Sequence, residues 1–112
     1  MFARRRLPFD RLTPAEVEDR LSTNSTLILD VREPHELRMD GRIAGATHIP
    51  MNNLPDRLAE LPADAEIVVY CAHGHRSMTV AKWLVSQGYT NVKDLSGGLA
   101  AWIASGHPVE RG

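Results

Sequence analysis

The only cysteine of the chain, Cys71, stands between an apolar segment at residues 66–70 and a short loop that contains Gly74. The apolar segment predicts a buried strand, and the residues from about Arg76 onward predict a helix. The thiol is therefore expected where a strand ends and a helix begins, a position at which backbone amides bind anions. These residue types in this order indicate a sulfur nucleophile beside an anion-binding loop.

The loop around the cysteine contains several groups that favour a thiolate. A free thiol is only about 3% ionised at pH 7, and the thiolate is the nucleophile. The loop amides, the positive end of the following helix and the Arg76 guanidinium each stabilise a negative sulfur, typically by roughly 0.3–2 kcal/mol. Gly74 permits a positive φ that turns successive amides inward. We therefore predict Cys71 as the nucleophile and, as the residues that bind the sulfur anion, Ala72, His73, Gly74, His75, Arg76 and Ser77.

The same residues allow other interpretations. A lone cysteine after a strand is often only a small hydrophobic residue, and Arg76 can instead be solvated or pair with a nearby acid. His73 and His75 are expected at the rim rather than as general bases, because little proton movement remains once the thiolate exists. With Cys71 they form a Cys-x-His-x-His cluster, but a closed zinc site takes four ligands and no other cysteine exists. No metal ion and no cofactor is expected.

A second buried strand is predicted at residues 27–31, where an apolar run includes Asp30 near its end. Ligands of open α/β sheets bind outside the carboxyl ends of the strands, so Asp30 and Cys71 are expected at the same edge. Arg32 follows directly. We expect Asp30 and Arg32 to support the site by tying its loops together through an ion pair and hydrogen bonds.

Helices are predicted between these strands. A helix start with a capping box is predicted by Thr13, Pro14 and Glu16. In this helix, Val17 and Leu21 are expected to face inward. The helix after the cysteine loop has a wide apolar stripe formed by Val80, Ala81, Trp83, Leu84 and Val85.

The remaining segments continue the alternation. A short helix is expected near Pro34 and a short strand at residues 46–49, and Asn53 is expected to cap a helix that presents Leu54, Leu58 and Leu61 on one face. Residues 92–95 predict a last strand and residues 97–106 a last helix. Continuous apolar strands separated by helices predict a doubly wound α/β fold, with a mostly parallel sheet and helices on both faces.

Length and charge limit the remaining possibilities. The 112 residues suit one domain, placed at residues 9–112 after a tail at residues 1–8. A net charge of -1 gives no global attraction to nucleic acid or to an anionic membrane. The basic N-terminus lacks the apolar segment of a signal peptide, and no stretch approaches a membrane span. A single thiol suits a reducing compartment, so a cytoplasmic location is expected.

The chain resembles the single-domain rhodaneses, which are thiosulfate or persulfide sulfurtransferases, over about residues 9–106. Five segments carry the resemblance in order: Asp30-Val31-Arg32-Glu33-Pro34-His35-Glu36, Gly41-Arg42-Ile43-Ala44-Gly45-Ala46-Thr47-His48-Ile49-Pro50, Cys71-Ala72-His73-Gly74-His75-Arg76-Ser77, Gly88-Tyr89-Thr90-Asn91-Val92 and Leu95-Ser96-Gly97-Gly98-Leu99-Ala100-Ala101-Trp102. The sequence departs from the family pattern at Arg42 and Ala44, where a histidine and a proline are common. One such segment is a weak signal, whereas five in order are specific.

The resemblance implies a rhodanese-like fold and a double displacement on Cys71. The sulfur would take the outer atom of thiosulfate or of a persulfide donor, and the loop amides with Arg76 would hold the resulting persulfide. An acceptor such as cyanide, a thiol, a sulfur-carrier protein or a thioredoxin-like protein would then remove it. A second cysteine is absent, so release must depend on an outside nucleophile.

Two alternatives remain beside a sulfurtransferase. Cysteine phosphatases and arsenate reductases of the same fold carry a wider loop, with five residues between cysteine and arginine, whereas four stand between Cys71 and Arg76. Tyr70 also occupies the position before the cysteine, where those enzymes have a histidine. The narrower loop suits one sulfur atom better than a tetrahedral oxyanion. The other alternative is a non-catalytic rhodanese-like module that binds a partner protein. A loop without its thiol and arginine would favour this alternative, whereas this loop has both.

Overall fold

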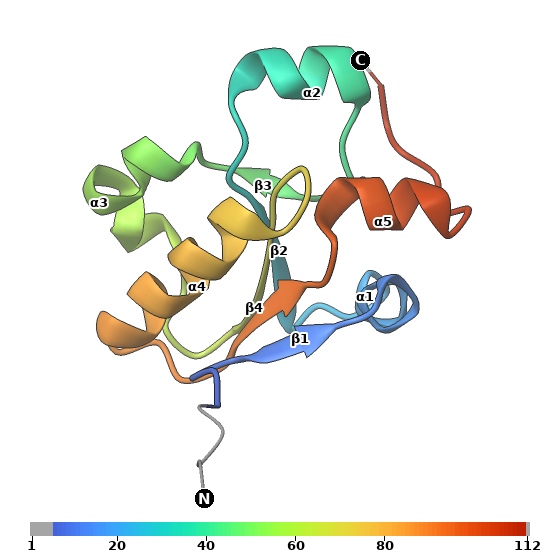
Figure 1. Ribbon diagram of the computed structural model, residues 1–112. Helices are drawn as coiled ribbons and strands as arrows, with labels where there is room; N and C mark the ends of the chain where they lie inside the picture. The colour runs from blue at the N-terminus through green and yellow to red at the C-terminus, as the bar shows by residue number, and fades with distance from the viewer. Residues whose placement is uncertain (1–5, 112) are drawn as a thin grey trace, which may run out of the picture.

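The computed structural model describes residues 6–111, so Gly112 and residues 1–5 of the predicted tail at 1–8 lie outside the described residues. Within the described part, five strands form one sheet in the order β1-β5-β4-β2-β3 (Figure 1). They are β1 (Asp10–Leu12), β2 (Thr26–Asp30), β3 (Thr47–His48), β4 (Glu66–Tyr70) and β5 (Val92–Leu95). Every neighbouring pair is parallel. The predicted α/β fold with a parallel sheet is confirmed.

Helices cover both faces of this sheet (Figure 1). The α-helices are α1 (Pro14–Arg20), α2 (Pro34–Asp40), α3 (Leu54–Arg57), α4 (His75–Ser86) and α5 (Gly98–Ala104), and two 3-10 turns, Met51–Asn53 and Leu58–Glu60, flank α3. Side chains of α3 and α4 pack on one face, and those of α1 and α5 pack on the other. Helix α2 buries none of its residues and lies beyond the ends of the strands.

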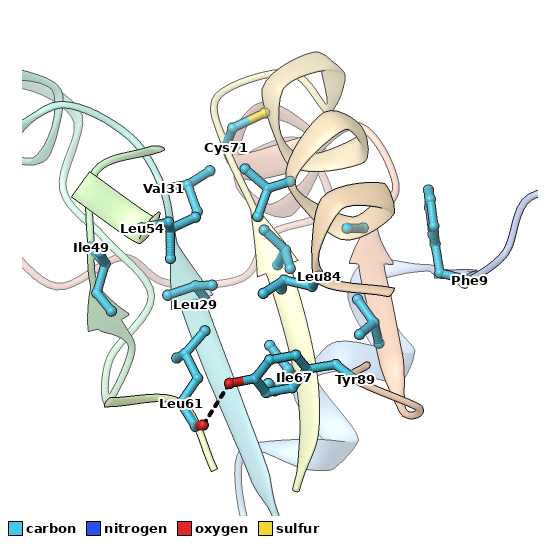
Figure 2. Close-up of a cluster of buried hydrophobic side chains, with 14 residues drawn as sticks. Phe9, Leu29, Val31, Ile49, Leu54, Leu61, Ile67, Cys71, Leu84 and Tyr89 are labelled. Atoms are coloured by element: carbon cyan, nitrogen blue, oxygen red, sulfur yellow. Dashed lines mark hydrogen bonds between the residues drawn. The ribbon is translucent and has the colours of Figure 1, made fainter. Parts of the chain in front are cut away.

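The core therefore consists of two apolar clusters with the sheet between them. Because successive side chains of a strand point to opposite faces, Ile67 and Val69 of β4 join one cluster while Val68 and Tyr70 join the other. Burial on both faces explains why the strands read as continuous apolar runs. Figure 2 shows Cys71 at one end of the first cluster, where β4 passes into the loop before α4.

The predicted start of α1 is confirmed. Thr13 is the N-cap, its side chain accepts from the backbone of Glu16 at 3.2 Å, and the Glu16 carboxylate accepts from the backbone of Thr13 at 3.0 Å. Val17 is fully buried. The prediction that Leu21 faces inward is wrong: the side chain is 38% exposed, because the helix ends at Arg20 and Leu21 belongs to the turn that follows.

The single helix expected from Asn53 to about Leu61 is also wrong, since only α3 is α-helical there, between two 3-10 turns. Asn53 makes no side-chain capping bond. A side chain from outside this segment binds two carbonyl oxygens near its end. The Tyr89 hydroxyl donates to Leu58 O at 3.2 Å and to Leu61 O at 2.8 Å, and Figure 2 draws the bond to Leu61. Leu54 and Leu61 are nevertheless buried, as the apolar spacing predicted.

Smaller differences concern short elements and helix faces. Strand β1 was not predicted, because three residues carry no periodic signal, and pairing with β5 alone defines it. The strand expected at residues 46–49 is reduced to β3. On α4 the predicted stripe divides into buried and half-buried positions: Val80, Ala81 and Leu84 are buried, whereas Trp83 and Val85 pack against the core from its edge.

Candidate active site

The thiol of Cys71 lies at the carboxyl end of β4 and is 1% exposed. The backbone amide of Gly74 donates to Sγ at 3.1 Å, and that of Ser77 donates at 3.3 Å. Gly74 has φ 102°, a conformation that side chains disfavour, and it forms the N-cap of α4. The loop thus supplies two N–H donors to one sulfur atom, an arrangement that stabilises negative charge there.

A series of hydrogen bonds leads from the sulfur through Ser77 to Asp94 in the interior. Sγ lies 3.4 Å from the hydroxyl of Ser77, and this hydroxyl donates to the Asp94 carboxylate on β5. Arg11 of β1 donates to the other carboxylate oxygen at 3.0 Å. Burial raises the pKa of Asp94, although the hydrogen bonds from Ser77 and Arg11 act against the rise. Sequence reasoning missed Asp94 and Arg11.

The N-terminus of α5 fixes the backbone of the cysteine loop. Leu99 N donates to Cys71 O at 2.8 Å, and Ala100 N donates to Ala72 O at 3.0 Å. Gly98 lies directly against these carbonyls, since a Cβ there would stand 2.5 Å from Cys71 O. The first turn of α5 therefore holds the peptide groups on which the position of Sγ depends.

Arg76 does not donate to the sulfur; its guanidinium forms two hydrogen bonds to the Glu36 carboxylate of α2, at 2.7 and 2.8 Å. This bidentate pair lowers the pKa of Glu36 to about 2 and raises that of Arg76. The acid partner considered for Arg76 from the sequence is thus present. The pair also joins α2 to the first turn of α4.

Asp30 and Arg32 form the expected buried ion pair. Arg32 donates from Nε at 3.1 Å and from Nη2 at 2.8 Å to the Asp30 carboxylate, and Nη2 also donates to Gly41 O at 2.8 Å. The Tyr70 hydroxyl donates to Asp30 and accepts from Ile43 N at 3.1 Å. Burial and the neighbouring Asp30 raise the pKa of Tyr70, which therefore stays a phenol and a donor. These hydrogen bonds connect the carboxyl ends of β2 and β4, and none of the groups in them contacts Sγ.

The other predicted site residues lie around the opening of the loop. His73 and His75 are exposed, and Ala72 is half-buried. A depression of about 300 Å³ lies beside the loop, and its lining includes Ala72, His73, Leu99, Ala100, Ile103 and Arg111. The structure thus gathers Cys71, Gly74 and Ser77 at the sulfur, and leaves both histidines at the rim as the sequence indicated.

Within residues 6–111, no three His, Cys, Asp or Glu side chains are grouped so as to hold a metal ion. In the same part of the chain, no helix has the length and apolar character needed to cross a membrane.

The Glu36–Arg76 pair is expected to make stability depend on acid pH. A carboxyl whose pKa is lowered on folding stabilises the fold above its unfolded value of about 4.5, and this contribution is lost as the pH falls toward 2. Glu36→Gln should therefore be less stable than the parent at pH 7, and the difference should shrink from about pH 4.5 downward. Urea unfolding at several pH values measures it. Glu60→Gln, in the exposed pair with Arg57, is the control with a smaller effect; a difference that does not change with pH would contradict the expectation.

Comparisons with known proteins identify the family of the chain. A sequence model of the Rhodanese-like domain matches residues 13–105. The chain is 39% identical over 87 residues to a sulfurtransferase of Allochromatium vinosum, covering 78% of this chain and 80% of that protein. It is 35% identical over 94 residues to the thiosulfate sulfurtransferase GlpE of Stutzerimonas stutzeri, covering 84% of each. The crystal structure of a rhodanese-related protein from Thermoplasma volcanium superposes with a TM-score of 0.81 at 35% identity, covering 91% of this chain and 98% of that one. The chain belongs to the Rhodanese-like domain family.

Proposed function

We propose that this chain is a sulfurtransferase that carries a sulfane sulfur as a persulfide on Cys71, from thiosulfate or a persulfide donor to an acceptor nucleophile. One observation supports the proposal most: the Sγ of the only cysteine receives two backbone N–H groups, from Gly74 and Ser77. Such donors stabilise a negative sulfur before, during and after transfer, and they need no reorganisation.

The reaction is a double displacement. The Cys71 thiolate attacks the outer sulfur of thiosulfate, the sulfur–sulfur bond of thiosulfate breaks, and sulfite leaves with the electron pair. Cyanide or a thiolate then attacks the outer sulfur of the persulfide, and the Cys71 thiolate is released. No cofactor or metal takes part in this scheme. Because the chain has no second cysteine, an outside nucleophile must complete each cycle.

The surroundings of the loop suit small sulfur anions. The depression beside Ala72 and His73 gives a donor a place next to the loop, and its lining includes two arginines, Arg32 and Arg111, and one carboxylate, Asp40. Arg76 adds a positive charge at the start of α4, but Glu36 offsets part of that charge. Loop size, rather than charge, favours sulfur transfer over phosphate chemistry: the four residues between Cys71 and Arg76 form a loop that suits one bound sulfur atom better than a tetrahedral phosphate.

The acceptor is a thiophilic small molecule or a protein. Cyanide and low-molecular-weight thiols fit the chemistry, and so does the thiol of a sulfur-carrier or thioredoxin-like protein. The free, buried thiol fits a reducing compartment, and we place the reaction in the cytoplasm.

Intact mass after incubation with thiosulfate tests the proposal. The protein should gain one sulfur atom, cyanide or a thiol should remove it, and Cys71→Ser should gain none. Because the thiolate is the reacting form, the incubation is repeated at several pH values from about 6 to 9. If no adduct forms at any of them, the protein is instead the non-catalytic binding module. Turnover of p-nitrophenyl phosphate without turnover of thiosulfate would identify a phosphatase.

A further inference from the structure

A chain of hydrogen bonds leads from the sulfur to a buried carboxylate. The Ser77 hydroxyl has one hydrogen, which it donates to Asp94, so its lone pairs face Sγ at 3.4 Å and the thiol hydrogen is donated to it. Ser77 and Asp94 are both 0% exposed. This direction of donation fits a neutral thiol beside an ionised Asp94. A thiolate, in contrast, requires that the Ser77 hydrogen turn toward Sγ.

We propose that Asp94 accepts the thiol proton through Ser77, so that the thiolate of Cys71 forms inside the protein without loss of a proton to water. The S–H bond breaks as its proton bonds to Ser77 Oγ, and the Ser77 proton passes to the Asp94 carboxylate. The electron pair stays on Sγ, and the net charge of the three groups is unchanged. This inference rests on the proposed role of Cys71 as the sulfur nucleophile.

The surroundings of Sγ and of the Asp94 carboxylate determine how readily the proton moves between them. At the sulfur, the amides of Gly74 and Ser77 already donate to Sγ and can hold the negative charge. At the carboxylate, burial disfavours the charged form and raises the pKa of Asp94. Arg11, 3.0 Å from Asp94, opposes the transfer because it holds the charge on the carboxylate.

The same path runs in reverse at the end of the reaction. When the acceptor removes the outer sulfur, the electron pair returns to Sγ as a thiolate. Asp94 can then give its proton back through Ser77 and restore the neutral thiol. Ser77 contacts the reacting atom and is therefore a catalytic residue, whereas Asp94 acts through Ser77 as a positioning residue that stores the proton.

The signature of this path is a thiolate fraction that does not depend on pH. While Cys71 and Asp94 share one proton, its distribution between them is an internal equilibrium, so lowering the pH does not remove the thiolate until a second proton binds. A thiol that exchanges its proton only with water loses its thiolate tenfold for each pH unit below its midpoint. Ionisable groups beside this network include Arg11 on Asp94, the Glu36–Arg76 pair, and His73 and His75 of the loop.

The rate of alkylation of Cys71 by iodoacetamide, measured against pH, tests the proposal without sulfur transfer, so it can fail while the proposed function stands. From pH 7 to pH 5 the parent protein should slow by less than about threefold, whereas Asp94→Asn should slow by about 100-fold, since an amide accepts no proton. Equal slopes in the two proteins would overturn the proposal. Repeating the comparison with His73 and His75 replaced by Asn removes the side chains that ordinarily change charge in this range.

Arg11→Gln gives a second test, because a third of the Arg11 side chain is exposed and the change leaves the buried core intact. If the proton passes from Cys71 to Asp94, loss of Arg11 removes a charge that holds Asp94 ionised. Alkylation at pH 6 should then accelerate by about threefold or more. If Asp94 only repels the thiolate, loss of a nearby positive charge should slow the reaction. An unchanged or slower rate would therefore overturn the proposal. Arg57→Gln is the matched control and should react like the parent.

Discussion

Replacement of Arg32 by methionine is expected to lower the free energy of unfolding by about 3–5 kcal/mol, the usual cost of breaking a buried ion pair. Arg32 is 0% exposed and donates to Asp30 from its backbone amide and from two guanidinium nitrogens. Methionine has a similar length but no donors. Asp30 would keep only the Tyr70 hydroxyl and the backbone amide, and Gly41 O would lose its bond to Nη2.

Urea unfolding of matched variants measures this effect. Arg57→Met removes an arginine from an ion pair on the surface and should cost far less. The double variant Asp30→Asn with Arg32→Met should be less destabilised than Arg32→Met alone, because no unpaired charge is then left in the core. If Arg32→Met were no worse than Arg57→Met, the buried pair would not support the strand ends.

The parts of the fold that could be predicted from the sequence are those with a local signal. The capping box of α1 needs only Thr13, Pro14 and Glu16, which stand within one helical turn. The strands β2 and β4 are short apolar runs, which suits burial on both faces. The cysteine loop combines a strand end, a glycine and a helix start in one continuous stretch, so its donors to Sγ could be inferred.

The parts that were missed depend on contacts between distant residues. Glu36 meets Arg76 across 40 positions, and Arg11 meets Asp94 across 83 positions, so no spacing along the chain reveals either pair. Asp94 did give a signal, since it is a charged residue in a predicted strand of a sheet expected to be covered on both faces, and a buried charge needs a partner. The partner itself, Ser77, could be named only from the structure.

Leu21 and the segment around α3 show a second limit. At Leu21 the burial prediction failed because the helix ends at Arg20. Around α3 the apolar spacing predicted burial better than the path of the backbone: Leu54 and Leu61 are buried, although the segment is no continuous helix. Side-chain burial follows from hydrophobicity, whereas helix length depends on what else bonds to the carbonyls, here the hydroxyl of Tyr89. Boundaries are therefore less determined by local sequence than burial.

Gly98→Ala is expected to reduce the proposed sulfur transfer by about 100-fold or more, since a displacement of roughly 1 Å at a reacting group has effects of that size. The added Cβ would stand 2.5 Å from Cys71 O and 2.7 Å from the carbonyl of Ala72. Both are backbone atoms of the cysteine loop, and the next two amides of α5 hold their oxygens at 2.8 and 3.0 Å. Neither side can move without moving the peptide that carries Sγ.

The control separates this displacement from simple backbone strain. Gly88 also has a positive φ, of 99°, but a Cβ there meets nothing within 4 Å. Gly88→Ala should thus cost stability, by about 1–2 kcal/mol for a left-handed residue, and retain sulfur transfer. Initial rates with thiosulfate and cyanide, measured well below the unfolding temperature of each variant, compare the two. If both variants retained similar rates, the first turn of α5 would not determine the position of Sγ, and the amides of Gly74 and Ser77 alone would define the site.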